Sequence, residues 1–373
     1  MTAPTASPPR PGPSRLELRA PAKLNLFLHV TGRRADGYHL LETVFRFVDL
    51  CDRIVLVARD DGRIVRSGGL AGLAPEDDLA VKAALALKNA SGFAGGADIA
   101  VSKVIPVGAG LGGGSSDAAS VLMGLNRLWR LELPRERLMA IGLTLGADVP
   151  VFVFGRNAYA TGIGERLEPV SLPPQWFVLA MPAVSVATGS VFGSPDLTRN
   201  TEAITLAGFS SQTSKAGGCA LFGRNDLEHV VFASEPAVLE TQRMLTEAVR
   251  LTLRLTPALT LRATPQAAPQ SSVPTQAGAD AGSVADGAIR DTPQWPRVRM
   301  TGSGACVFAV ADNELEAGRI AEAFGQLAAR QRKRVNDVVS SSEDEASLRK
   351  ASHRVFVVAG LQEHPFRERT AGE

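Results

Sequence analysis

A glycine-rich run at residues 106–117, Pro-Val-Gly-Ala-Gly-Leu-Gly-Gly-Gly-Ser-Ser-Asp, constrains this chain more than any other feature. Five glycines fall within residues 108–114. Glycine accepts positive φ and lacks the Cβ that would keep an anion away from the backbone. Successive backbone N–H groups can then converge on one cluster of oxygens, and a following helix adds the positive end of its dipole. The run therefore predicts a loop that binds a polyphosphate.

The segments on either side indicate that this loop is ordered. Residues 97–101 have the pattern of a strand, and apolar residues recur every three or four positions from Ala118 to Trp129. That spacing predicts a helix that begins after Ser116. A flexible linker would have neither neighbour.

Two familiar phosphate motifs fit less well. Gly108, Gly110 and Gly113 match the dinucleotide-binding string, but that motif needs a second apolar strand and an acid about 20 residues on. Glu132 supplies an acid, and no apolar strand precedes it. A P-loop needs Gly-Lys before Ser or Thr, and the chain contains no Gly-Lys pair.

Three segments together resemble the superfamily of galactokinase, homoserine kinase, mevalonate kinase and phosphomevalonate kinase. Residues 106–116 resemble its phosphate loop, residues 21–26 (Pro-Ala-Lys-Leu-Asn-Leu) its N-terminal motif, and residues 301–305 (Thr-Gly-Ser-Gly-Ala) its C-terminal glycine turn. The resemblance implies a kinase that uses ATP with Mg²⁺. It also implies an α+β fold of two domains, an N-terminal mixed-sheet domain with the phosphate loop and a C-terminal ferredoxin-like α/β sandwich.

Composition agrees with a folded, two-domain enzyme. The chain has 373 residues, of which 45% are hydrophobic, and its formal net charge of +2 implies no nucleic-acid partner. Cys51, Cys219 and Cys306 lie far apart without metal-ligand spacing, as expected for reduced thiols in the cytoplasm. No apolar run reaches membrane-spanning length. The sequence is compatible with either a monomer or a weak dimer.

Local patterns divide the chain. We expect a disordered arm at 1–14, an ATP-binding domain at 15–172 and a substrate domain at 173–373. The last of these contains an unstructured Ala/Pro-rich insertion at about 256–296 and a polar surface loop at about 331–345. Expected strands are 16–30 (broken at Pro21), 40–57, 97–101, 176–181, 306–310 and 354–358, and expected helices are 79–87, 118–129, 135–145, 225–246 and 314–330. Their irregular alternation favours an α+β class.

Phosphoryl transfer requires held phosphates, neutralised charge and a hydroxyl aimed in line. The resemblance assigns ATP binding to Pro106, Gly108, Gly110, Leu111, Gly112, Gly113, Gly114, Ser115, Ser116 and Asp78. Ser115 and Ser116 could equally cap the helix, donate to phosphate or reach Mg²⁺. Asp117 could complement the helix dipole or bind the metal, so the metal ligands stay open.

Lys23 and Asp148 are the expected catalytic pair. Lys23 interrupts an apolar strand, where a buried ammonium needs a partner, and Asp148 follows a helix and precedes the apolar run 149–154. Each alone could be an edge-strand charge or a turn residue. Both match the catalytic Lys and Asp of the family. An ion pair would keep Asp148 ionised beside the acceptor alcohol, as a general base or an orienting group.

Residues 22–39 and 142–155 narrow the resemblance to the branch that phosphorylates the 2-hydroxyl of a cytidine-diphosphate-linked methylerythritol in non-mevalonate isoprenoid synthesis. Tyr38 and Phe192 could sandwich a cytosine ring, and His39 could read its edge. Asn25 could bond the erythritol hydroxyls. The resemblance adds Thr188 and Gly302 to this substrate site.

The chain departs from the family pattern at two places. The family often has Asn where this chain has Asp78, and an ionised Asp cannot donate to the nucleotide. A proline common near Gly189 is absent. The alternatives are another small-molecule kinase of the superfamily, acting on mevalonate, homoserine or a sugar, and a non-catalytic relative that senses a ligand.

Overall fold

The computed structural model describes residues 14–68, 72–209, 221–254, 297–338 and 352–367. Its strands are β1 Arg15–Arg33, β2 His39–Arg59, β3 Ile64–Gly68, β4 Gly96–Ser102, β5 Ala158–Thr161, β6 Arg166–Pro169, β7 Trp176–Pro182, β8 Val298–Met300, β9 Val307–Ala311 and β10 His353–Ala359. Its α-helices are α1 Leu79–Ser91, α2 Gly113–Leu128, α3 Arg135–Leu143, α4 Val149–Phe154, α5 Thr188–Gly193, α7 Glu228–Ser234, α8 Pro236–Arg254 and α9 Glu314–Val338. The expected disordered arm and the insertion at 256–296 lie outside the described residues, apart from Ser14.

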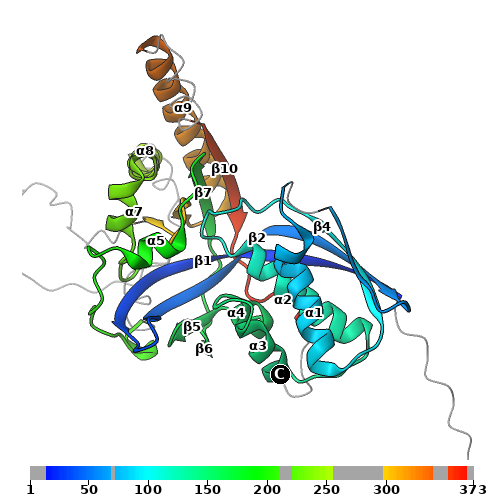
Figure 1. Ribbon diagram of the computed structural model, residues 1–373. Helices are drawn as coiled ribbons and strands as arrows, with labels where there is room; N and C mark the ends of the chain where they lie inside the picture. The colour runs from blue at the N-terminus through cyan, green and yellow to red at the C-terminus, as the bar shows by residue number, and fades with distance from the viewer. Residues whose placement is uncertain (1–13, 69–71, 210–220, 255–296, 339–351, 368–373) are drawn as a thin grey trace, which may run out of the picture.

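A mixed sheet forms the N-terminal lobe, which we define as β1–β6 with α1–α4. The strand order is β3-β4-β2-β5-β6, with β1 paired to β2 and only β3 and β4 parallel. Helices α1–α4 lie below the long β1–β2 hairpin (Figure 1). Apolar residues of α2 such as Leu122 and Leu125 pack with Leu56 and Ile99 of the sheet. The two-domain, mixed-sheet fold expected from the sequence is confirmed.

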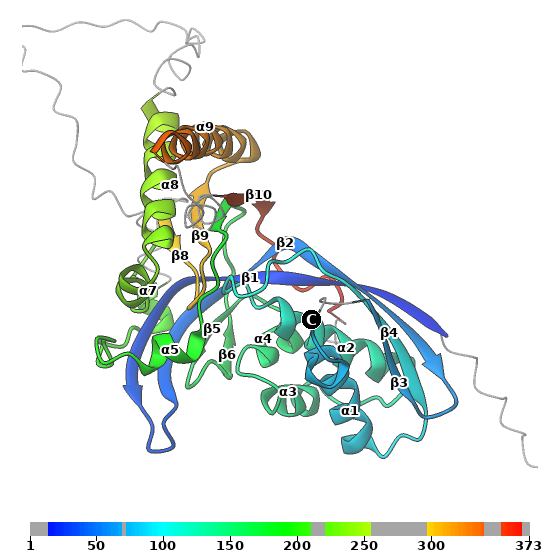
Figure 2. The ribbon, with the colours of Figure 1, turned by 45° about the horizontal axis from the view of Figure 1, so that its top comes forward.

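A second sheet forms the C-terminal lobe, with strand order β10-β7-β9-β8 and every pair antiparallel. Helices α8 and α9 lie together beside it (Figure 2). Leu245 of α8 and Phe324 of α9 share a core cluster with Val178 and Ala309 of the sheet. A four-stranded antiparallel sheet covered by helices is the layered sandwich that the resemblance implied.

The β1–β2 hairpin belongs to both lobes. Leu28 and Val30, near the end of β1, pack in the C-terminal core. Phe27, which is fully buried, joins Leu179 of β7 and Phe308 of β9 in a cluster between the lobes. Full burial of such a side chain stabilises a fold by roughly 1.5–3 kcal/mol. The two lobes are therefore fastened along one strand, and Lys23 lies on its middle part.

Four expectations about local structure are wrong. Strand β1 continues through Pro21, where a register shift against β2 absorbs the proline in place of a break. The helix expected at 225–246 is two helices, α7 and α8, because Pro236 starts a new helix after Glu235. Helix α9 runs through Gln331 to Val338, in the first part of the polar loop expected at 331–345, and the rest of that loop lies outside the described residues. Helix α2 begins at Gly113, ahead of Ser116.

The end of the described chain returns to the N-terminal lobe. Leu361 and Phe366 pack against its core, and His364 is 1% exposed, with its backbone N–H donating to Gly155. Residues 361–367 thus belong spatially to the first lobe, although 173–373 was expected to form the second.

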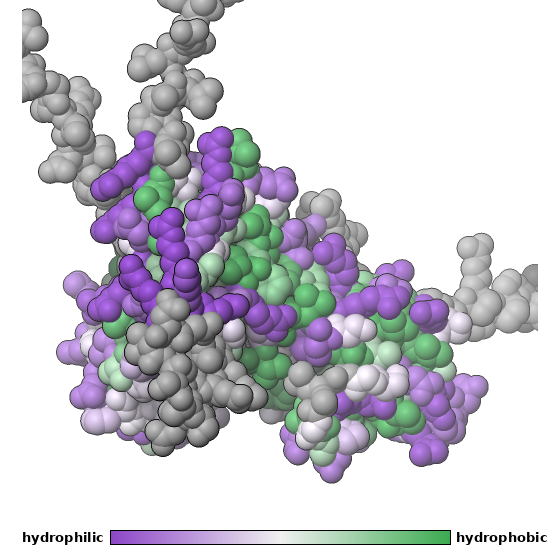
Figure 3. Space-filling model, turned by 90° about the horizontal axis from the view of Figure 1, so that it is seen from above, coloured by the Kyte–Doolittle hydropathy of each residue, from purple (hydrophilic) through white to green (hydrophobic). Residues whose placement is uncertain are grey.

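The surface is uneven in polarity. Seen from above, apolar side chains gather in the middle of the molecule and polar ones dominate towards its outer parts (Figure 3). Within the described segments, no helix combines the length and the apolar character needed to cross a membrane.

Candidate active site

The glycine loop joins β4 to α2 and bends through three left-handed residues. Gly108, Gly110 and Gly112 have φ of 71°, 79° and 71°. L-residues with a Cβ rarely adopt this region. Gly112 is also the residue before α2, so the loop ends at a helix N-terminus whose free N–H groups suit a phosphate.

Both lobes hold this loop in place through its backbone. The N–H of Lys23 donates to the carbonyl of Leu111 (3.0 Å), and the N–H of Cys306 donates to the carbonyl of Ala109 (3.2 Å). An ideal Cβ on Gly304 would lie 2.0 Å from the nitrogen of Gly110, so only a hydrogen atom fits there. The glycine turn at 301–305 is therefore packed directly on the phosphate loop.

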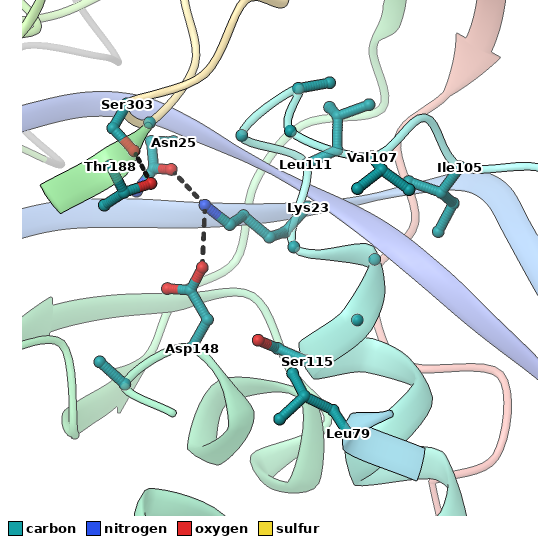
Figure 4. Close-up of a pocket in the computed structure, with 18 of the residues that line it drawn as sticks. Lys23, Asn25, Leu79, Ile105, Val107, Leu111, Ser115, Asp148, Thr188 and Ser303 are labelled. Carbon is teal, nitrogen blue, oxygen red and sulfur yellow. Dashed lines mark hydrogen bonds and ion pairs between the residues drawn. The ribbon is translucent and has the colours of Figure 1, made fainter. Parts of the chain in front are cut away.

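Lys23 is almost fully buried, and its ammonium is shared between two acceptors. Nζ donates to Oδ1 of Asn25 at 2.7 Å and lies 3.3 Å from Oδ2 of Asp148. The ring of Phe45 lies 5.5 Å from the same nitrogen. Figure 4 shows the ammonium pointing into the cleft, between Asn25 and Asp148.

Asp148 reaches this pair from the other wall of the cleft. It lies between the end of α3 and the first residue of α4, and its side chain is 36% exposed. It does not cap α4 with its side chain, so the carboxylate is free to face Lys23. The structure thus brings together the two residues that the sequence singled out as a pair.

Asn25 uses both the oxygen and the nitrogen of its amide inside the protein. Its Oδ1 accepts from Lys23, its Nδ2 donates to the hydroxyl of Thr43 at 2.9 Å, and the side chain is 3% exposed. Its backbone N–H donates to the hydroxyl of Thr301. In this arrangement Asn25 orients Lys23, and a contact with substrate hydroxyls stays a prediction.

An ionic cluster fastens the two ends of the phosphate loop. Lys103, which precedes the loop, contacts Oδ2 of Asp52 and lies 2.6 Å from Oδ2 of Asp117, which follows it on α2. Asp52 also accepts the N–H groups of Val104 and Ile105. Burial raises the pKa of Asp117 to about 7; Lys103 opposes this shift and Asp52 adds to it. We call these three side chains the loop clamp.

The loop clamp bears on two roles that the sequence left open. Asp117 is 4% exposed and paired with Lys103, and both side chains line the cleft, so a role of Asp117 as a metal ligand stays a prediction. Ser115 and Ser116 lie inside the first turn of α2, and the N-cap position belongs to Gly112. The hydroxyl of Ser116 is buried, whereas that of Ser115 faces the cleft (Figure 4).

Asp78 serves as the N-cap of α1. Its carboxylate accepts from the N–H of Ala80 at 2.9 Å and lies 3.1 Å from the guanidinium of Arg66. The Arg66 partner explains how Asp is accommodated where the family often has Asn, since the cation balances the extra charge. Asp78 lines the cleft together with Gly114 and Ser115.

The cleft between the lobes has a volume of about 610 Å³. It is lined by Lys23, Asn25, Asp78, Pro106, Asp148, Thr188 and Gly302, and by the loop residues Gly108, Gly110, Leu111, Gly112, Gly113, Gly114 and Ser115. A second hollow, which we call the base pocket, is lined by Tyr38, His39, Thr188, Gly189 and Phe192, among others. Leu41, Ala147, Ile163, Thr188 and Phe192 line both spaces, so the two form one continuous site.

Inside the base pocket, the ring of His39 packs on that of Phe192, with centroids 5.2 Å apart. Tyr38 is 60% exposed and available to a ligand. The hydroxyl of Thr188 bonds that of Ser303 at 2.8 Å, which links the pocket to the glycine turn.

Four site residues escaped the sequence reasoning: Asp52, Arg66, Lys103 and Arg199. Asp52 lies inside the expected strand 40–57, and the other three lie in segments for which the sequence predicted no helix or strand. For Lys103 and Asp52, the available signal was a charge next to a buried strand, of the same kind that singled out Lys23.

The donor set fits a magnesium ion that arrives with the nucleotide. No group of three or more His, Cys, Asp or Glu side chains in the described ranges could hold a metal alone. Mg²⁺ usually takes one or two protein oxygens and completes its shell with phosphate oxygens and water. Ser115, whose hydroxyl faces the cleft, and the partly exposed Asp148 would supply such oxygens.

Comparison with known proteins agrees with this geometry. The model for the GHMP kinases N terminal domain matches residues 78–156, and that for the GHMP kinases C terminal matches residues 297–329. A 4-diphosphocytidyl-2-C-methyl-D-erythritol kinase from Cupriavidus metallidurans is 45% identical over 322 residues, 86% of this chain and 92% of that protein. Another from Thiobacillus denitrificans is 54% identical over 219 residues, 59% of this chain and 76% of that protein.

Solved structures give the same answer. A crystal structure of 4-(cytidine 5'-diphospho)-2C-methyl-D-erythritol kinase matches 92% of this chain and 99% of its own, with 30% identity and a TM-score of 0.63. A homoserine kinase from Cytophaga hutchinsonii, at 15% identity and a TM-score of 0.54, shares the fold. The extent and identity of these matches show that this chain belongs to the 4-diphosphocytidyl-2-C-methyl-D-erythritol kinase family of GHMP kinases.

Proposed function

We propose that this protein transfers the γ-phosphoryl group of ATP to the 2-hydroxyl of 4-diphosphocytidyl-2-C-methyl-D-erythritol, giving the 2-phosphate and ADP. One observation carries the proposal: the Lys23–Asp148 pair lines the same cleft as the glycine loop, and Ala147, next to Asp148, also lines the base pocket. A nucleotide tail on the loop and an alcohol anchored by a base would meet at this pair.

The residues divide the work of the reaction. The backbone N–H groups of the glycine loop and the start of α2 would hold the phosphates. Asp148, partly exposed and close to a cation, would accept the hydroxyl proton or orient the hydroxyl in line. Lys23, fixed by Asn25, would stabilise the negative charge that develops between donor and acceptor.

Magnesium would neutralise charge on the β- and γ-phosphate oxygens when bound with ATP. The chain's own contribution would be the hydroxyl of Ser115 beside the loop, with Asp148 across the cleft.

The acceptor's base would sit between Tyr38 and Phe192, while Thr188 and Gly302 line the passage to Lys23. Stacking on such side chains contributes about 1–3 kcal/mol per base in nucleic-acid sites. We also propose the cytoplasm as the compartment, because Cys51 and Cys306 are free thiols.

The decisive experiment is a coupled ADP-release assay on the purified protein with the cytidyl substrate, mevalonate, homoserine and galactose as competing acceptors. We expect turnover with the cytidyl substrate alone. Turnover of another acceptor at equal kcat/KM would reassign the protein within the GHMP kinases, and ligand binding without ADP release would make it a sensor.

A further inference from the structure

Arg199 follows α5 and is tied to one side of the base pocket by four hydrogen bonds. Its Nε donates to Nε2 of His39 at 3.1 Å. Its two terminal nitrogens donate to backbone carbonyls of Leu197 (3.0 Å), Phe192 (3.2 Å) and Ser194 (2.6 Å). The guanidinium thus closes the segment 192–199 around itself and joins it to β2, where His39 is the first residue.

This contact determines where His39 carries its proton. A guanidinium has N–H donors and no acceptor, so the ring nitrogen that faces it must accept. Nε2 is therefore unprotonated, and the proton of the neutral ring lies on Nδ1. No hydrogen bond within the described residues uses Nδ1 of His39, so this N–H has no protein acceptor there, and His39 lines the pocket.

Burial and the charges around the ring also favour the neutral form of His39. Burial, followed by Arg199 and then Arg33 of β1, lowers the pKa of His39. Asp36 also lines the base pocket, but its carboxylate is paired with Arg34 at 2.7 Å. The ring of His39 therefore stays neutral near pH 7.

We propose that Arg199 is a positioning residue of the base pocket, which holds His39 as a neutral ring protonated on Nδ1 and sets Phe192 against that ring. One arginine would fix two parts of one pocket wall, because it bonds both the ring of His39 and the backbone of Phe192. The inference rests on the proposed function in one respect, namely that this pocket receives the base of the acceptor.

The tautomer can be read directly, without any substrate. The chain contains five histidines, so protein labelled with ¹⁵N-histidine gives few ring signals, and the His39 signals are those lost in His39→Gln. Two-bond ¹⁵N–¹H spectra from pH 5.5 to 8 should show His39 neutral with the proton on Nδ1. A proton on Nε2, or a charged ring at pH 7, would overturn the proposal.

Kinetics then test the consequence for the pocket. Arg199→Met should raise KM for the cytidyl acceptor about tenfold or more, leave KM for ATP within about twofold, and introduce a dependence of acceptor KM on pH between about 6 and 7. Arg199→Lys, which keeps a cation, should suppress that new pH dependence. Arg243→Met, at an exposed arginine of α8 paired with Glu240, is the matched control and should change neither constant.

These outcomes distinguish a failure of the inference about Arg199 from a failure of the proposed function. Equal changes in both KM values for Arg199→Met, with no new pH dependence, would reduce Arg199 to a structural role. If the wild-type protein phosphorylates no cytidyl substrate, the proposed function fails while the tautomer result still stands. If Arg199→Met does not fold, the wild-type spectra alone decide.

Discussion

Nζ of Lys23 lies 3.3 Å from the Asp148 carboxylate, although the two residues come from opposite walls of the cleft and from distant parts of the chain. Lys23 comes from β1, the strand shared by both lobes, and Asp148 comes from the connection between α3 and α4. The contact depends on the arrangement of the whole N-terminal lobe, and it is the observation on which the proposed reaction site rests.

Asp148→Asn tests the acid. We expect kcat to fall about 10²–10⁴-fold with little change in stability, because the amide keeps the shape and loses the ability to take a proton. Steady-state kinetics and urea unfolding measure both effects. Glu136→Gln, at an exposed carboxylate in the first turn of α3, should behave as wild type. Near-full kcat in Asp148→Asn would remove this residue from the mechanism.

Lys23→Met tests the cation. Removing the ammonium leaves Oδ1 of Asn25 without its donor and Asp148 without its counter-charge. We expect kcat to fall on the order of 10²–10³-fold. Lys23→Arg should retain part of the rate, since the positive charge is preserved. If the Met and Arg variants are equally impaired, packing of the lysine and not its charge is what matters.

Tyr38→Ala tests the base pocket. Tyr38 is 60% exposed, so its loss should not unfold the protein. Losing a stacking platform worth about 1–3 kcal/mol should raise KM for the cytidyl acceptor by about 5–150-fold, with KM for ATP nearly unchanged. Tyr38→Phe keeps the ring and should stay close to wild type. A parallel rise in both KM values would argue against stacking.

Gly304→Ala tests the contact between the glycine turn and the phosphate loop. A Cβ there would meet backbone atoms of Ala109 and Gly110 at about 2 Å, so the loop must move. We expect KM for ATP to rise at least tenfold and the midpoint of thermal unfolding to fall. Gly318→Ala on α9, where nothing lies within 4 Å, should be neutral or stabilise the helix by about 0.5–1 kcal/mol.

The loop clamp predicts how stability depends on pH. With a folded pKa of about 7, Asp117 keeps a proton between about pH 4 and 7 that the unfolded chain has already released. Asp117 therefore makes its full contribution to the free energy of unfolding at low pH, and this contribution is lost as the pH rises from about 4 to about 7. Asp117→Asn removes that dependence. The free energy of unfolding of the variant minus that of wild type should therefore increase, by on the order of 1–3 kcal/mol, as the pH rises from 4.5 to 7.5.

Urea unfolding at several pH values measures this difference, with Glu136→Gln as the control. A difference between variant and wild type that does not change with pH would mean that Asp117 stays ionised in the folded protein.

Sequence patterns predicted most of the fold because they report local physics. The apolar spacing after the glycine run predicted α2, and the two-lobe architecture followed from the resemblance. One error lies where a non-local contact decides, because pairing with β2 carries β1 through Pro21. Two others have local causes: Pro236 divides the helix expected at 225–246, and the left-handed Gly112 precedes an α2 that begins ahead of Ser116.

Like the fold, the candidate site could be predicted from the sequence only in part. Lys23 and Asp148 each stood out as a charge beside apolar residues, and their convergence is confirmed. Lys103 and Asp52 of the loop clamp carried the same kind of signal, but the pairing of the clamp residues, like the role of Arg199, arises only when segments far apart in the chain meet. An arginine in a polar loop and a lysine at a strand end are otherwise unremarkable.

The return of residues 361–367 to the first lobe has a consequence for biosynthesis. His364 fills a buried position between α2 and Gly155, and its pKa is lowered to about 3 by that burial, so it enters as a neutral ring. A ribosome makes these residues only after it has made the strands and helices of the C-terminal lobe. The N-terminal lobe therefore completes its core only after the C-terminal lobe has been synthesised, and a nonsense codon just after β10 would damage the lobe that was synthesised first.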